Sequence, residues 1–246
     1  MSMQSPVKTS GTSDSASEVV SSILQEARER VTLRRVLLVC GIAAAVWWVA
    51  IDVVGSFRYP GYSYVDQTIS ELSAIGAPTR TFMMTVSGIP YAVLMIAFGV
   101  GVWLVTGVRS RVGKIAGALL IIEAIFGYVG GVLFPMATRE VLAAGEETLR
   151  NRLHAPYGLG MPILFVLVTI VGSRLLGKRF RWYSYATIAI TLVTGFMVGM
   201  QVEQMQANEP TPLLGIIERI TAYVPMLWIV VFALGLLRRE ADTTKS

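Results

Sequence analysis

Charged residues are scarce in this chain. Asp, Glu, Lys and Arg make up 15% of its 246 residues, and hydrophobic residues make up 54%. A soluble domain carries charge on about a quarter of its residues, so the composition predicts an integral membrane protein whose main partner is the lipid bilayer. The net charge of +5 does not indicate a nucleic-acid partner, because the basic residues lie in short clusters beside apolar segments. Clusters placed in this way set the orientation of a membrane protein.

Cysteine and histidine are almost absent. The single cysteine, Cys40, excludes an intramolecular disulfide, and the single histidine is His154. A tetrahedral zinc site of His and Cys ligands is disfavoured with one residue of each type. The chain also lacks a glycine-rich phosphate loop, a nucleophile elbow and a paired-cysteine motif. We therefore expect no cofactor and no metal, while a metal site of carboxylates with His154 stays open as an alternative.

Long apolar runs, by contrast, are plentiful. A helix needs about 20 predominantly apolar residues to cross a bilayer, and the stretches that qualify are 36–57, 81–108, 112–134, 154–176, 182–205 and 213–237. We therefore predict an all-α, polytopic six-transmembrane-helix bundle over residues 36–237. Pro90, Pro162 and Pro225 lie inside three of these spans. We expect them to kink the helices, with neighbouring groups binding the carbonyls that they free.

The basic residues are divided unevenly between the two ends of the predicted bundle. One end has six of the 21 Lys and Arg residues: Arg58, Arg80, Arg139, Arg150, Arg152 and Arg219. The other end has Lys8, Arg28, Arg30, Arg34, Arg35, Arg109, Arg111, Lys114, Arg174, Lys178, Arg179, Arg181, Arg238, Arg239 and Lys245. By the positive-inside rule, we expect a multi-pass protein of the inner (plasma) membrane with both termini cytoplasmic. The loops 58–80 and 135–153 then face outward.

The chain ends differ from the spans. Residues 1–16 are rich in Ser, Thr and Gly, which predicts a disordered cytoplasmic tail. Residues 17–35 carry apolar residues at helical intervals, and Ser15 with Glu18 has the spacing of a capping box. This pattern predicts an amphipathic cytoplasmic lead-in helix that lies on the membrane surface. Residues 238–246 form a second short cytoplasmic tail.

The first outward loop carries its own helix signals. Ser63 and Asp66 have N-cap to N3 spacing, and Gly76 followed by Pro78 is a helix stop, so we predict a short interfacial amphipathic helix over 64–75. Asp66, Ser70 and Ser73 would share one face of this helix. Capping explains Asp66, whereas no capping role is assigned to Glu71. Glu71 is therefore the stronger functional candidate.

Charged residues inside the spans are costly and are by default functional or paired. Asp52, Glu203, Glu218 and Arg219 approach the same outer face as the loop. They form either a functional site or interhelical ion pairs, for example between Arg219 or Arg80 and one of these carboxylates. Glu123 differs, because it lies in the middle of the third span with no basic residue at helical spacing.

His154 opens the fourth span at the same outer face, where it is either a polar helix start or a proton donor and acceptor among carboxylates. We therefore predict an outward-facing polar pocket, with Glu71, His154 and Asp66 as catalytic candidates. The predicted ligand-binding residues are Asp66, Ser70, Glu71, Arg80, His154, Glu203, Glu218 and Arg219.

Four stretches together resemble a known family. They are the segment YPGYSYVDQTISELSAIGAPTR, the LFP at residues 133–135, the histidine that opens the fourth span, and GIIERITAYVPMLW from Gly215. The chain resembles the prokaryotic membrane family known as domain of unknown function 998 over roughly residues 36–237. The chain departs from the family pattern after Pro135, where Met136, Ala137 and Thr138 replace a common acidic residue. The resemblance implies six transmembrane helices and no established activity. A similar Ile-Ser motif after the first span also gives a distant likeness to eukaryotic membrane proteins that assist lipid-anchor remodelling.

Three functions are consistent with these patterns. The first is the binding or remodelling of a lipid or amphiphile at the outward pocket. The second is proton-coupled transport of a small solute, with Glu123 as the proton-coupling residue. The third is a non-catalytic scaffold or accessory subunit whose charges tie helices together.

Overall fold

The computed structural model describes residues 11–106 and 110–243. Residues 1–10 of the expected disordered tail lie outside the described residues, as do Lys8, Arg109 and Lys245 of the orientation argument. The structure is about 80% helical, and no strand occurs within the described ranges. It has six helices that are long and apolar enough to cross a membrane, so the predicted all-α six-helix bundle is confirmed.

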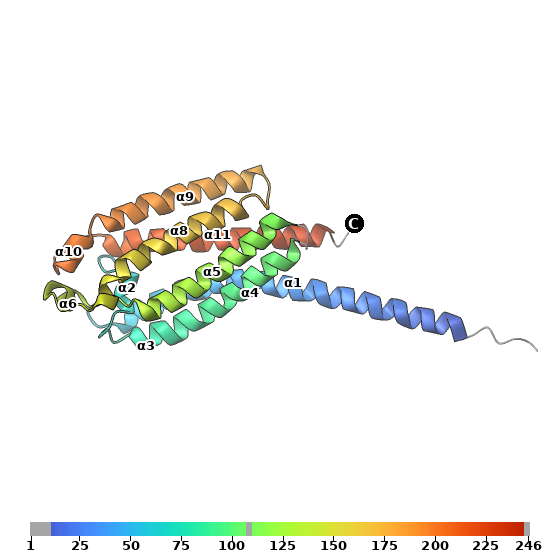
Figure 1. Cartoon of the computed structure of the whole chain (residues 1–246), viewed down its shortest axis with the longest axis horizontal. Coiled ribbons are helices and arrows are strands. Elements are labelled where there is room, and N and C mark those ends of the chain that lie inside the picture. Colours follow the sequence, from blue (N-terminus) through green and yellow to red (C-terminus); the bar gives the residue numbers. More distant parts are fainter. Residues whose placement is uncertain (1–10, 107–109, 244–246) are drawn as a thin grey trace, which may run out of the picture.

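Long helices form the body of the bundle (Figure 1). They are α1 (Gly11–Arg58), α4 (Ile89–Val105), α5 (Arg111–Leu133), α8 (His154–Gly172), α9 (Lys178–Gly199) and α11 (Leu214–Thr243). The second span begins before α4 with α3 (Arg80–Phe82) and the π-helical η1 (Met83–Gly88), and α7 (Leu149–Arg152) precedes α8. The short helices α2 (Ile69–Leu72), α6 (Arg139–Ala143) and α10 (Val202–Gln206) lie together at one end, which we call the loop end.

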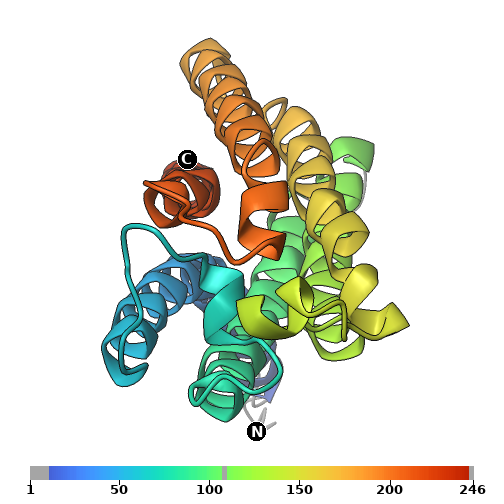
Figure 2. The same ribbon diagram turned by 90° about the vertical axis from the view of Figure 1, so that its left-hand side faces the viewer.

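The long helices pack in a ring. Helix α1 packs against α4 and α11, α4 against α5, α5 against α8, and α9 against both α8 and α11. Figure 2 views this ring from the loop end, with α2 lying over the interior. Trp228 is fully buried in the core and stacks on Phe232 with ring centroids 4.8 Å apart. The first and last spans are therefore neighbours, which matters for the charges described below.

The outside of the bundle is apolar. Phe196 is 71% exposed, Leu159 65% and Val93 59%. Large apolar side chains exposed on several helices are costly in water, whereas lipid tails solvate them well. The chain is thus a multi-pass membrane protein.

The lead-in segment differs from the prediction. Helix α1 begins at Gly11, before Ser15, and continues through the first span without a break to Arg58. Its N-terminal part projects beyond the end of the bundle opposite the loop end, in line with the first span (Figure 1). The capping-box spacing of Ser15 and Glu18 therefore does not mark a helix start, since the favourable helical residues on both sides extend the same helix.

The predicted proline effect is visible at Pro90. A proline lacks the N–H that would bind the carbonyl four residues earlier, which here belongs to Val86 in the π-helical segment η1. The indole Nε1 of Trp47 on α1 donates a 2.9 Å hydrogen bond to this carbonyl. A side chain from the neighbouring span thus satisfies the backbone group that the proline frees.

The fifth span ends earlier than predicted. Helix α9 stops at Gly199, and Glu203 lies in the separate helix α10. Its side chain is exposed, so Glu203 is a residue of the loop end and not a charge inside a span.

Candidate functional site

A buried ion pair joins the first and last spans at the loop end. Arg219 on α11 places Nε 3.0 Å from Asp52 Oδ2, and its Nη2 lies 3.2 Å from Asp52 Oδ1. Asp52 is 0% exposed and Arg219 is 2% exposed. Tyr223 also donates to Asp52, at 2.5 Å. A buried ion pair is tolerated only when the other lone pairs and N–H groups of its partners are also hydrogen-bonded. Both carboxylate oxygens of Asp52 accept hydrogen bonds here.

The same guanidinium holds the loop between the first two spans. Arg219 Nη1 donates to the carbonyls of Tyr64 at 2.8 Å and Gln67 at 3.2 Å. The guanidinium also lies over the Tyr64 ring, 3.6 Å from its centroid. Nη2 donates to the hydroxyl of Tyr62 at 2.9 Å. Arg219 is therefore surrounded by protein acceptors and is not available to a ligand.

Glu218 and Asp66 fasten other parts of this loop. The carboxylate of Glu218 accepts from the backbone N–H of Ile69 and, at 3.4 Å, from the hydroxyl of Ser70. Asp66 Oδ1 accepts from the backbone N–H of Leu213 at 3.0 Å. These carboxylates bind the backbone at the start of α2 and α11, where unpaired N–H groups favour negative charge.

The predicted helix over 64–75 is wrong in its extent. Ser63 and Asp66 do interact, with the Ser63 hydroxyl 2.9 Å from Asp66 Oδ2, but they hold a turn. The helix here is the single turn α2, with Thr68 as its N-cap and Glu71 as N3 of a capping box. Glu71 therefore has a capping role that the sequence interpretation did not assign to it. Helix α2 is also buried on the bundle, since Leu72 is 0% exposed.

Glu71 makes a second ion pair, with Arg139 of α6. Arg139 Nε lies 2.6 Å from Glu71 Oε1, and Nη2 lies 3.0 Å from Oε2. Burial raises the pKa of Glu71, but the hydrogen bonds from Arg139, Gln67 and Thr68 outweigh burial and leave the pKa below 4.5. The carboxylate is ionised at neutral pH and joins the loop after the first span to the loop after the third.

A further contact joins these two loops. The N–H of Ile75 donates to the carbonyl of Met136 at 2.8 Å, and Ile75 forms an isolated parallel bridge with Ala137. Arg139 Nη2 reaches the fifth-to-sixth connection as well, through the Thr211 hydroxyl at 2.9 Å. Three loops that are distant in sequence thus meet around Arg139.

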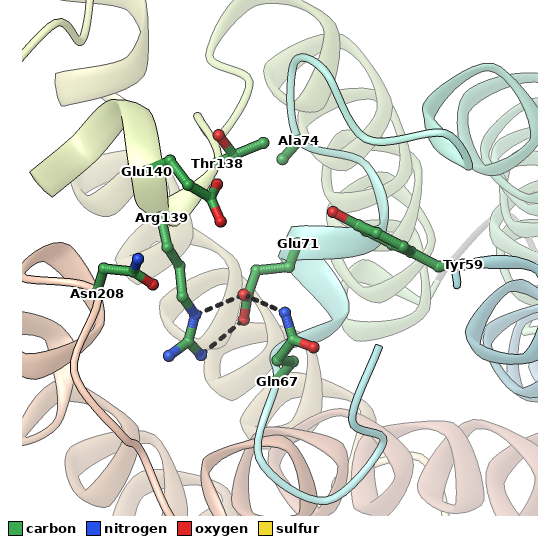
Figure 3. A pocket seen from close by; sticks show the side chains of 8 residues that line it. All are labelled: Tyr59, Gln67, Glu71, Ala74, Thr138, Arg139, Glu140 and Asn208. Atoms are coloured by element: carbon green, nitrogen blue, oxygen red, sulfur yellow. Dashed lines mark hydrogen bonds and ion pairs between the residues drawn. The ribbon is translucent and has the colours of Figure 1, made fainter. Parts of the chain in front are cut away.

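A pocket of about 240 Å³ opens where these loops meet. Figure 3 shows the side chains that line it: Tyr59, Gln67, Glu71, Ala74, Thr138, Arg139, Glu140 and Asn208. The ion pair of Glu71 and Arg139 forms one wall, and the carboxylate of Glu140 and the hydroxyl of Tyr59 point into the space (Figure 3). The pocket is polar, and it lies where the apolar spans end.

The predicted site residues fall into two groups. Asp66, Ser70, Glu71, Glu218 and Arg219 are brought together around α2, but only Glu71 lines the pocket.

Arg80, His154 and Glu203 lie elsewhere. Arg80 Nη1 donates to the Ser73 carbonyl, and Glu203 is exposed on α10. His154 Nδ1 lies 2.8 Å from the Phe134 carbonyl, with its ring against Tyr157. This histidine binds the carbonyl at the end of α5, and none of the carboxylates in the described part of the chain is hydrogen-bonded to it. Of His154, Glu71 and Arg219, which were predicted to share one outward pocket, only Glu71 lines the pocket in the structure.

Glu123 is 4% exposed on α5, and its Oε2 has no hydrogen-bond partner among the described residues. It is separate from the loop-end pocket. No three His, Cys, Asp or Glu side chains in the described part of the chain are placed to hold a metal ion.

Sequence interpretation missed Arg139 as a site residue. It appeared only as one of the outward basic residues, in a loop without a recognised motif. The only signal was its charge, because the family pattern has an acidic residue within a position or two after Pro135 and Arg139 lies beyond that point. No sequence pattern marked three other lining residues, because they come from three loops that only the fold brings together: Tyr59, Glu140 and Asn208.

These features define a class: six-helix membrane proteins whose loops are fixed over one end of the bundle by buried ion pairs. A comparison with known families assigns the chain more narrowly. Residues 42–235 match the family described as protein of unknown function (DUF998). The match covers most of the chain, and the chain belongs to this family. No curated protein and no solved structure matches it.

Proposed function

We propose that this protein binds the polar head of a lipid or other amphiphile in the loop-end pocket. The observation that supports the proposal is a polar pocket of about 240 Å³ located where apolar, lipid-facing helices end. An amphiphile has the matching chemistry, since its head needs polar partners while its tail stays against apolar helix surface. By the positive-inside rule, this end faces outward from the inner membrane and both termini are cytoplasmic.

The contacts favour binding over catalysis. Glu71 accepts hydrogen bonds from Thr68, Gln67 and Arg139. Asp66 is bonded to the backbone of Leu213. A general acid or base must reach the proton that it transfers, and these two carboxylates are directed at the protein itself. Binding is therefore the activity that the remaining free groups of the pocket support.

The test fills the pocket. Glu140→Trp places an indole at the pocket wall, and Glu146→Trp is its matched control, because Glu146 is also an exposed glutamate of the 135–153 loop but does not line the pocket. The full-length proteins are purified from native membranes and the co-purified lipids are counted by native mass spectrometry. We expect Glu140→Trp to lose at least one lipid that the wild type and Glu146→Trp retain. Equal lipid counts in all three proteins would refute the proposal.

A second candidate is proton-coupled transport, and one observation favours it. Glu123 is buried inside the third span with an unpartnered Oε2, and intramembrane carboxylates are typical of proton relays. Proteoliposomes that contain a pH-sensitive dye report proton flux under an imposed pH gradient. Glu123→Gln should abolish the flux and Glu146→Gln should not. A wild type without flux above protein-free vesicles removes this candidate.

A further inference from the structure

The charges of the pocket do not cancel. Glu71 and Arg139 neutralise each other at 2.6 Å. Arg139 also donates to the Thr211 hydroxyl and to the carbonyls of Asp66 and Glu209. Its guanidinium is directed at these protein acceptors, so little donor capacity remains for an anion. Arg139 therefore holds the loops together and does not serve as an anion-binding residue.

Glu140 supplies the remaining charge. Its side chain is exposed, and no hydrogen bond or ion pair to it occurs among the described residues. It follows Arg139 on α6, and its carboxylate points into the pocket (Figure 3). The net formal charge of the lining is thus negative.

The other free groups of the pocket suit a cation as well. Thr138 and Asn208 offer a hydroxyl and an amide oxygen, both of which accept hydrogen bonds. The Tyr59 hydroxyl points into the space (Figure 3), and its oxygen is a further acceptor. Burial and the nearby carboxylates of Glu140 and Glu71 raise the pKa of Tyr59, so its hydroxyl stays neutral.

The same imbalance extends over the whole loop end. The basic side chains at this end all have protein partners. Arg58 lies over the Phe82 ring, and Arg152 forms an ion pair with Glu147. Arg80 donates to the Ser73 carbonyl and Arg150 to the Val132 and Leu133 carbonyls, while Arg139 and Arg219 make the contacts described above. Exposed carboxylates without a described hydrogen bond or ion pair are Glu140, Glu146, Glu203 and Glu209. An approaching cation therefore meets free carboxylates, while an anion meets arginines already in use.

We propose that the pocket selects a primary ammonium group, carried by the head of an amphiphile or by a free amine, with Glu140 as the counter-charge. This inference rests on the proposed function and names its ligand class. An ammonium has three N–H donors, and Glu140, Thr138 and Asn208 provide acceptors of three kinds on the lining.

The experiment removes the charge without filling the pocket. Full-length wild type, Glu140→Gln and Glu146→Gln are placed in nanodiscs of phosphatidylcholine doped with either phosphatidylethanolamine or phosphatidylglycerol of the same acyl chains, and the lipid retained after detergent extraction is measured. Free ethanolamine is added as a competitor in a separate arm. We expect phosphatidylethanolamine to be retained over phosphatidylglycerol, and Glu140→Gln to weaken this retention about fivefold, as expected for one partly solvated ion pair of about 1 kcal/mol. Glu146→Gln should behave as wild type.

The outcomes separate the two proposals. If Glu140→Gln retains phosphatidylethanolamine as well as the wild type does, or if phosphatidylglycerol is retained equally, the ammonium assignment is wrong. Loss of lipid in Glu140→Trp would still uphold head-group binding in that case. Ethanolamine that displaces the lipid at millimolar concentration shows that a free amine is sufficient to occupy the site, whereas retention unaffected by ethanolamine shows that the rest of the lipid is required.

Discussion

Replacing Arg219 with methionine tests the account of the loop end most directly. Methionine keeps the length and apolar contacts of the side chain but removes the guanidinium, so Asp52 stays 0% exposed without its ion-pair partner. Breaking a buried pair from one side costs about 3–5 kcal/mol. The carbonyls of Tyr64 and Gln67 lose a donor as well. At about 2–4 °C for each kcal/mol, the midpoint of thermal unfolding should fall by about 6–20 °C.

The assay is intrinsic tryptophan fluorescence of the detergent-solubilised protein during heating. Arg152→Met is the matched control, because Arg152 pairs with Glu147 at 3.1 Å but is 63% exposed. An exposed pair contributes at most about 1 kcal/mol, so this midpoint should barely move. Asp52→Asn combined with Arg219→Met removes the orphaned charge and should recover part of the loss. Equal shifts for Arg219→Met and Arg152→Met would refute the buried-pair reasoning.

Other predictions concern the loop and its neighbours. Gly215→Ala should destabilise the protein by about 1–3 kcal/mol, measured by the same assay, because an added Cβ would lie 2.6 Å from the Tyr64 carbonyl oxygen; an unchanged midpoint would show that the loop moves freely. The folded-state pKa of Glu71 is lowered from 4.5, so its contribution to stability should be complete above pH 4.5 and be lost as the pH falls below it through the lowered pKa. The midpoints of thermal unfolding of wild type and Glu71→Gln should therefore converge as the pH is lowered below 4.5, and a constant difference between them would contradict this. Trp47→Phe leaves the Val86 carbonyl without its 2.9 Å donor and should cost about 1–3 kcal/mol, and a smaller change would mean that another group replaces the indole.

The spans were predictable because their signal is local. Twenty apolar residues in a row have few alternatives to a membrane helix, and the bundle confirms all six. The freed carbonyl at Pro90 was equally foreseeable, since the missing N–H is a property of the proline itself. Which donor would reach Val86 was not, because Trp47 lies on another span.

The loop was harder, since two capping signals overlap within it. Ser63 with Asp66 and Thr68 with Glu71 have the same spacing, and only the second forms a capping box. The choice depends on Arg219, which lies far along the chain and binds the carbonyls of Tyr64 and Gln67 in the turn over 64–67. The spacing of residues in the sequence does not reveal such long-range contacts.

The partners of the charged residues were the least predictable part. Ion pairing of Arg219 was one of the alternatives that the sequence left open, but the specific partner requires that the last span pack beside the first. Arg139 joins the 135–153 loop to Glu71 in the first loop and to Thr211 in the connection before the last span, and these three segments are far apart in the sequence. Contacts between loops carry no periodic signal, so they emerge only from the fold.

The position of Asp52 and Arg219 at opposite ends of the chain has a consequence for biogenesis. Asp52 enters the membrane with the first span, whereas Arg219 is synthesised with the last. A lone aspartate in a span costs up to about 2.5–3.5 kcal/mol on insertion scales. The first loop lacks its contacts with Glu218 and Arg219 until α11 arrives. The translocon must therefore deliver the sixth helix beside the first before the loop end takes its final shape, and truncation before α11 should leave that loop open to protease.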